Sequence, residues 1–361
     1  IGLPQNAAQL LTGSVYNTIA QTVAMQSRRD TVRADARFSA TDNLDFTVGF
    51  NTYKKTGNMP WGYGFAFNNL QEVPMVIDNR ETEVSMGVEW ASHQGMFRAN
   101  YERSKFDQNI PTFRWDNPWR ATDFCRAGIA GQAPGTCYDP SGYTNGNGPN
   151  DGLSAMGPTN SLNTFSWMAM VKLPGKTTAN ASFSAGANKQ DAALIPWTTN
   201  PVVANPTVYA AFPALRSLPR DTADLHVNYQ TATMNISSRP HKDLTLAARY
   251  RYNGRSDFRR PFDAVEYVRF DAVPEETGGD SEPWSIDRNS TEVSAKFMGI
   301  PKSAIKVAYG EDKLEHLDRV THGVKDKTTR LSFDTMGNQY VTVRAQYART
   351  DRETIGFESE I

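Results

Sequence analysis

Apolar and polar residues alternate with a period of two along many short stretches of this chain. From Val32 to Ser39 every second residue is apolar and the residues between are Arg, Asp, Arg and Ser. After Thr41–Asn43 the alternation resumes from Leu44 to Asn51. A period of two places one set of side chains on each face of a β-strand, whereas a helix would need a period near 3.6. The pattern therefore predicts strands with one apolar face and one polar face.

The same unit, an alternating stretch, a tight turn and a second alternating stretch, recurs along the sequence. It predicts six hairpins, or roughly twelve strands, with one or two more near residues 14–26 and 263–270. The predicted turns are Thr41–Asn43, Ser92–Gly95, Pro174–Lys176, Arg239–Lys242, Gly299–Pro301 and Met336–Asn338.

The connections between the predicted hairpins are far longer than the turns within them. Examples of these long connections are Lys55–Arg80, Asp107–Asn160 and Lys189–Arg220. Loops of that length are uncommon in compact soluble domains, whereas outer-membrane barrels combine short periplasmic turns with long outer loops. We therefore expect an all-β fold, a transmembrane antiparallel up-and-down β-barrel with about 12–14 strands, formed by residues 1–361 as one domain. A soluble β-sandwich or β-propeller would also alternate; in those folds the apolar faces would pack against each other.

Charge and hydropathy narrow the choice of function. The chain has 38 Lys and Arg against 39 Asp and Glu, so it lacks the basic excess by which nucleic-acid-binding proteins displace counterions. No segment approaches the roughly 18–20 consecutive apolar residues of a membrane-spanning helix. The expected location is the bacterial outer membrane, crossed many times by strands and surrounded by outer-membrane lipid.

Two cysteines, Cys125 and Cys137, lie in one Gly-, Asn- and Pro-rich stretch. Their spacing suits a loop disulfide in an oxidising compartment; two unrelated thiols are the alternative. The sequence begins at Ile1 without a signal-peptide pattern and ends at Ile361 without a terminal aromatic residue. We expect it to be part of a longer polypeptide, and the barrel domain to be incomplete.

Charged residues of both signs fall on the polar face of the predicted strands. In a barrel they would point toward enclosed water or pair across strands. They could form a wet surface that docks a partner protein, or simply line a water-filled lumen. The lumen-facing candidates are Arg33, Asp35, Arg37, Glu83, Glu89, Arg98, Glu102, Arg249, Arg251, Lys296, Lys306, Arg330 and Arg344.

Motifs for catalysis or cofactor binding are absent from the sequence. Covalent haem attachment requires Cys-x-x-Cys-His, and neither cysteine belongs to such a motif. The five histidines match no zinc spacing, and there is no nucleophile elbow or P-loop. We therefore predict that the chain is not an enzyme, has no catalytic or metal-binding residues, and carries no cofactor of its own.

Three strings resemble the decahaem-associated outer-membrane barrels of the MtrB/PioB family. They are Phe106–Trp119, Leu173–Asn180 with the later Gln190 and Pro196–Asn200, and Ser237–Pro240 leading into Leu244–Tyr252. The hairpin rhythm agrees over most of residues 30–350.

The resemblance implies a porin sheath around a multihaem c-type cytochrome, through which electrons cross the outer membrane. Haem would then be present only in that partner. Family barrels have about twice as many strands as are predicted here, so this chain would cover roughly half of one. Some members carry a Cys-x-x-Cys near the N-terminus, which this sequence lacks. The rival functions are a diffusion porin or solute transporter, and a structural scaffold barrel.

Overall fold

The structure is a computed structural model, and it describes most of the chain. The described residues are 22–65, 69–116, 151–201, 203–269, 271, 273–276, 278–279, 281–316, 321–336 and 340–357. Cys125 and Cys137, and most of the predicted turn at Met336–Asn338, lie outside these ranges.

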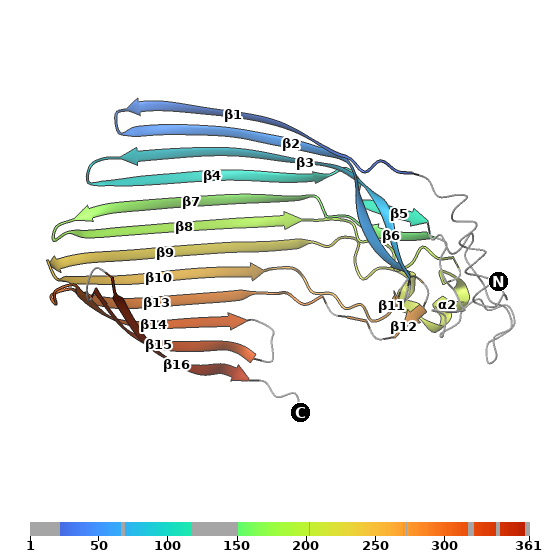
Figure 1. Cartoon of the computed structure of the whole chain (residues 1–361). Coiled ribbons are helices and arrows are strands. Elements are labelled where there is room, and N and C mark those ends of the chain that lie inside the picture. The colour runs from blue at the N-terminus through green and yellow to red at the C-terminus, as the bar shows by residue number, and fades with distance from the viewer. Residues whose placement is uncertain are drawn as a thin grey trace.

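Twelve long strands form one antiparallel sheet, in the order β1-β2-β3-β4-β7-β8-β9-β10-β13-β14-β15-β16. Each strand therefore pairs with its neighbours along the chain, apart from two short hairpins that lie outside the sheet (Figure 1). The strands are β1 Ser27–Thr41, β2 Leu44–Phe65, β3 Asn69–Ala91, β4 Gly95–Gln108, β7 Asn160–Leu173, β8 Thr177–Gln190, β9 Leu225–His241, β10 Leu244–Asp257, β13 Ile286–Phe297, β14 Ser303–His316, β15 Thr321–Met336 and β16 Thr342–Phe357.

β1 and β16 are the edges of this sheet. Within the described part of the chain no ladder joins them, and Figure 1 shows them on opposite sides of the curved sheet. The turns that connect the strands gather at one end, and the longer excursions gather at the other. We call these the turn end and the loop end.

The strand pairing places nearly all the predicted apolar positions on one face. The exceptions are Leu225, Val227 and Tyr229 at the start of β9, which the alternation predicts on the same face as Met234 and Ile236 but which lie on the opposite face. Phe38 lies opposite Phe46, Phe46 opposite Val88, and the sequence of pairs continues through every ladder to β16. We call this the apolar face. Its side chains are open rather than packed, since Phe38 is 68% exposed and Tyr347 is 63% exposed. In the described part of the chain, no second apolar layer of the kind that a sandwich requires covers them.

The apolar belt crosses the hydrogen-bonded rows of the sheet obliquely. The row through Phe38, Phe46 and Val88 reaches Lys313 on β14 and Glu353 on β16. On those later strands the apolar residues lie nearer the turn end. A level apolar belt therefore requires the strands to be tilted, as in membrane barrels, where the tilt is about 35–45°.

The tight turns follow the predicted chemistry at most positions. Gly175 and Lys176 have φ of 76° and 54°, the left-handed conformation that glycine adopts without strain. The turn predicted at Arg239–Lys242 is wrong by two residues, because β9 continues to His241 and only Lys242 and Asp243 form the turn. Proline suggested a turn, yet a bulge in the β9–β10 register accommodates Pro240 within the strand.

The loop predicted over Lys55–Arg80 is the clearest error of the sequence pattern. β2 and β3 continue as a paired ribbon through this segment to Phe65 and Asn69. Pro60 lies opposite Pro74. The amide of Asn58 donates to the carbonyl of Gln26 on the β1 side. Backbone nitrogens two residues apart in a strand point to the same side, so the nitrogen of Pro60 also points away from β3. Neither proline then removes a ladder hydrogen bond, and the pair is compatible with a strand.

The two other long connections contain short elements at the loop end. Asp107–Asn160 includes the hairpin of β5 (Thr112–Asp116) and β6 (Asp151–Ala155). Tyr63 of the extended ribbon stacks on Trp115 of this hairpin, with ring centroids 3.6 Å apart. The possible strand at 263–270 is β11 (Tyr267–Arg269), which pairs with β12 (Val273–Glu275) outside the main sheet. Near 14–26, residues 22–26 are not strand, and the rest lie outside the description.

Lys189–Arg220 contains α2 (Pro206–Ala211) and the 3-10 turn η1 (Pro213–Arg216). The side chain of Asn205 caps α2 by accepting hydrogen bonds from the amides of Thr207 and Val208, at 2.9 and 3.1 Å.

The main hydrophobic cluster of the described residues lies here rather than on the sheet. Trp197, Tyr209 and Val268 pack against its buried members, which are Val203, Val208, Phe212 and Leu215. We call this the loop-end core.

Candidate functional site: the polar face of the sheet

The face opposite the apolar belt collects the thirteen predicted lumen-facing residues. The pairing register places every one of them on this polar face, for example Asp35 in one row with Gly49 and Ser85. The others are Arg33, Arg37, Glu83, Glu89, Arg98, Glu102, Arg249, Arg251, Lys296, Lys306, Arg330 and Arg344. That they line enclosed water is still a prediction.

Many of these charges form ion pairs within or across strands. Arg33 contacts Asp35 at 2.7 Å, and Arg37 contacts Asp45 on the neighbouring strand. Arg98 lies 3.4 Å from Glu89. Arg330 and Arg344 pair with Glu292 and Asp334 at 2.8 and 2.6 Å. Because these side chains are largely exposed, each pair contributes little to stability, roughly 0–1 kcal/mol. Their main effect is to hold charges of both signs in fixed positions.

A neutral strip runs along the middle of the polar face, on β7, β8 and β9. Its residues are uncharged, most of them are small, and several of the polar ones form hydrogen bonds with one another. Ser182 and Thr233 share a hydrogen bond of 2.7 Å, and Asn235 donates to Asn180 at 2.9 Å. The strip consists of Thr164, Ser166, Met168, Met170, Asn180, Ser182, Ser184, Gly186, Thr231, Thr233 and Asn235. The charged positions of the sequence do not indicate the neutral strip, because it contains none of them. The alternation of Ser, Thr and Asn with apolar residues is the sequence pattern that indicates it.

The strands that flank the neutral strip carry opposite charge on the polar face. β3 and β4 present Glu81, Glu83, Glu89 and Glu102 on the polar face, against Arg98. β10, β13 and β14 present mainly bases, including the directly opposed pair Lys296 and Lys306. The bases are Arg249, Arg251, Arg255, Arg288, Lys296 and Lys306, and the acids there are Asp257, Glu292 and Asp312. Next to the neutral strip, the polar face thus has an acidic side on β3 and β4 and a basic side on β10, β13 and β14.

At the loop end, Asp271 joins two segments that are far apart in the sequence. Its carboxyl accepts hydrogen bonds from the Thr198 hydroxyl and from the backbone of Thr199 and Asn200, and its carbonyl accepts from the Asn200 side chain at 2.8 Å. Burial raises the pKa of Asp271 from 3.8 to about 6, against the opposing effect of these hydrogen bonds. No pattern in the sequence indicates this contact.

This contact predicts a pH-dependent loop end. A raised folded-state pKa means that the stabilisation is complete below about pH 4 and is lost as pH rises through about 6, a change on the order of 2–3 kcal/mol. We expect hydrogen exchange at Thr199 and Asn200, corrected for intrinsic rates, to be faster at pH 7.5 than at pH 5. Asp271→Asn should remove the difference. Equal protection at both pH values in the unmodified chain would contradict this assignment.

Other chemistry-bearing residues are dispersed. In the described part of the chain no three His, Cys, Asp or Glu side chains gather as a metal site. His93 lies in a turn, His226 and His322 lie on strands, and His241 and His316 are the last residues of their strands. The helices that the structure describes include none long and apolar enough to cross a bilayer.

Comparison with known proteins decides the family. A family model described as "Putative outer membrane beta-barrel porin, MtrB/PioB" matches residues 1–359. The chain belongs to this family. It is therefore an outer-membrane β-barrel, and its apolar face is the surface that meets lipid. The resemblance noted in the sequence strings is confirmed, as are the barrel fold and the outer-membrane location.

Other comparisons with this MtrB/PioB protein are more distant. No curated protein matches it. Among solved structures, the CymD monoaromatic hydrocarbon channel is 7% identical, with a TM-score of 0.26 over 98% of this chain and 89% of that one. The Ralstonia pickettii toluene transporter TbuX is 10% identical, with a TM-score of 0.22 over 92% and 88%.

Proposed function

We propose that this MtrB/PioB barrel encloses a multihaem c-type cytochrome and insulates it as electrons cross the outer membrane. The family resemblance implies such a partner. The observation that carries the proposal is the neutral strip, because its small side chains, such as Ser166, Ser182 and Ser184, let another protein surface approach the wall closely. The acidic and basic sides of the polar face would then orient that surface, since charge complementarity selects one docking geometry.

The sheet edges support a wide barrel. A strand edge inside a bilayer would leave backbone groups without partners, which costs several kcal/mol for each group. β1 and β16 do not pair with each other in the described residues, so the proposed closed barrel contains more strands than these twelve. A wider barrel has room for a protein in its lumen.

Neighbouring residues on opposite faces give a matched test. Ser184 lies on the polar face within the neutral strip, and Ala185 lies on the apolar face. We expect Ser184→Trp to reduce the haem that copurifies with the barrel by about tenfold or more, because the ring would obstruct close docking. Ala185→Trp, which faces lipid, should leave it unchanged.

The contradicting outcome is an unmodified barrel that copurifies without haem from membranes in which a multihaem cytochrome is expressed. Single-channel recording separates the rival function. A diffusion porin would conduct strongly after purification, whereas a barrel that retains its cytochrome should conduct ions weakly.

A further inference from the structure

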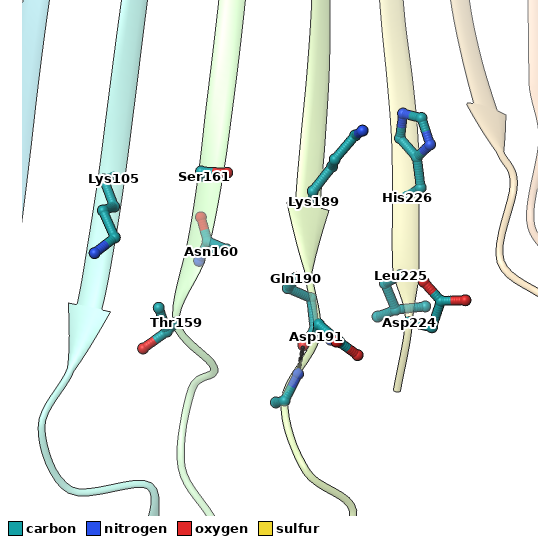
Figure 2. A pocket seen from close by; sticks show the side chains of 11 residues that line it. Lys105, Thr159, Asn160, Ser161, Lys189, Gln190, Asp191, Asp224, Leu225 and His226 are labelled. Carbon is teal, nitrogen blue, oxygen red and sulfur yellow. Dashed lines mark hydrogen bonds between the residues drawn. The ribbon is translucent and has the colours of Figure 1, made fainter. Parts of the chain in front are cut away.

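A hollow of about 480 Å³ lies at the loop end of β4, β7, β8 and β9, where side chains from both faces of the sheet line it. Lys105, Ser161, Lys189 and His226 form one row across β4, β7, β8 and β9. Figure 2 shows these four side chains at a similar height on neighbouring strands, with the Lys189 amine directed toward His226. These four side chains share the face of the apolar belt, which is opposite to the polar face.

The row lies just beyond the apolar belt. On β4, Tyr101 ends the belt, and Arg103 and Lys105 follow on the same face at successive steps of about 6–7 Å. We call Arg103, Lys105, Lys189 and His226 the basic patch. In a membrane barrel this level is where acyl chains give way to lipid headgroups.

Two bases of the patch lack an acidic partner, in contrast to bases elsewhere on this rim. Within the described residues, Arg103 and Lys189 form no ion pair, and Lys105 pairs with Asp107 at 2.7 Å. On the other side of the sheet, Lys325 and Lys327 are paired, with Glu311 and Glu353 at 2.7 and 3.0 Å.

Two polar atoms of the same surface are buried without a hydrogen-bond partner. They are Nε2 of His226 and Oδ1 of Asn228, the latter in the row of Arg103. Buried polar atoms normally have a partner, and His226 lines the hollow, so its Nε2 points to a ligand or ordered water there.

Three acids form a second layer beyond the basic patch. Asp107, Asp191 and Asp224 each lie two residues beyond a member of the basic patch, on the side away from the belt. Figure 2 shows Asp191 and Asp224 nearer the strand ends than Lys189 and His226. An anionic group is therefore attracted to the level next to the belt and repelled from the level above it.

We propose that the basic patch binds a phosphate group of lipopolysaccharide in the outer leaflet, with the acyl chains of that lipid against the apolar belt below. The long connections of an outer-membrane barrel face the cell exterior, which places the loop end in the outer leaflet. Lysine and arginine bind phosphate through charge-assisted hydrogen bonds, and basic pockets of this kind hold lipid headgroups. The site is independent of any protein in the lumen.

The test is the thermal stability of the full chain in detergent, followed by tryptophan fluorescence while purified lipopolysaccharide is added. We expect lipopolysaccharide to raise the unfolding temperature, because a ligand that binds only the folded state stabilises it. In the double variant Arg103→Gln and Lys189→Gln, the concentration needed should rise about 10- to 100-fold, as expected for two lost contacts with a charged group. The control, Lys325→Gln with Lys327→Gln, removes two paired bases from the same face and should respond like the unmodified chain.

Three further arms identify the source of the phosphate. Dephosphorylated lipopolysaccharide, phosphatidylglycerol and inorganic phosphate should each give a much smaller shift than intact lipopolysaccharide. The proposal is overturned if inorganic phosphate or phosphatidylglycerol stabilises equally well, if dephosphorylation has no effect, or if the double variant responds like the control. Should the double variant fail to fold, native mass spectrometry of the unmodified chain with intact and dephosphorylated lipopolysaccharide decides between the same outcomes.

Discussion

Met86→Arg is expected to prevent most of the barrel from assembling in lipid vesicles. Met86 lies in the middle of the apolar belt on β3, where its side chain is 52% exposed on the lipid-facing side. An arginine at the bilayer midplane of a barrel costs about 2–4 kcal/mol. That cost is a large part of the marginal stability of a folded protein. Folding would be measured by the heat-modifiable mobility of the barrel on gels and by urea titration in vesicles.

Ser85→Arg is the matched control, because Ser85 is the adjacent residue on the opposite face. Its row contains Gly49 and Asp35, so an arginine there would find open space and an acidic neighbour. We expect near-normal folding. Equal loss in both variants would show that β3 tolerates no arginine at this level, and the division into lipid and water faces would lose its support.

Val208→Asp is expected to unfold the loop-end core while the barrel stays folded. Val208 is 2% exposed and packs in the cluster with Val203, Phe212 and Leu215. An aspartate there would be a buried charge without a partner, a change that costs roughly 3–5 kcal/mol. Limited proteolysis should then cut within residues 195–220, and the heat-modifiable mobility of the barrel should be unchanged.

Ala210→Asp is the control, because it introduces an aspartate at an exposed position of the same helix, α2. It should leave the loop end resistant to proteolysis. Loss of the barrel in Val208→Asp would show instead that the loop-end core is needed for the strands to assemble. That result would contradict the separation between the cluster and the sheet.

The strand pattern was predictable because lipid imposes the same demand on every strand. Alternation at Val32–Phe38 and at Val84–Trp90 gave the correct faces, and the tight turns at Ser92 and Pro174 gave the correct hairpins. The extension of β2 and β3 was not predictable in this way. Beyond the belt no side chain must be apolar, so the backbone continues to pair without leaving an alternating signature, and Gly57, Pro60 and Pro74 resemble loop residues.

The candidate sites differ in how far the sequence pattern alone predicts them. Charged members of the polar face were found from alternation alone. The neutral strip, the Asp271 contact and the basic patch depend on which strands are neighbours and in what register. Lys105 and His226, for example, lie in one row, three strands apart, only because of the pairings of β4, β7, β8 and β9.

The oblique course of the apolar belt has a consequence for how the strands find their partners. A slip of two residues in one ladder would keep every side chain on its proper face, so alternation alone cannot forbid it. It would, however, move the apolar belt of all later strands by about 7 Å along the strand direction. That distance is a large fraction of a hydrocarbon layer about 25 Å tall. The thickness of the membrane therefore disfavours register slips of an even number of residues, which alternation alone would permit.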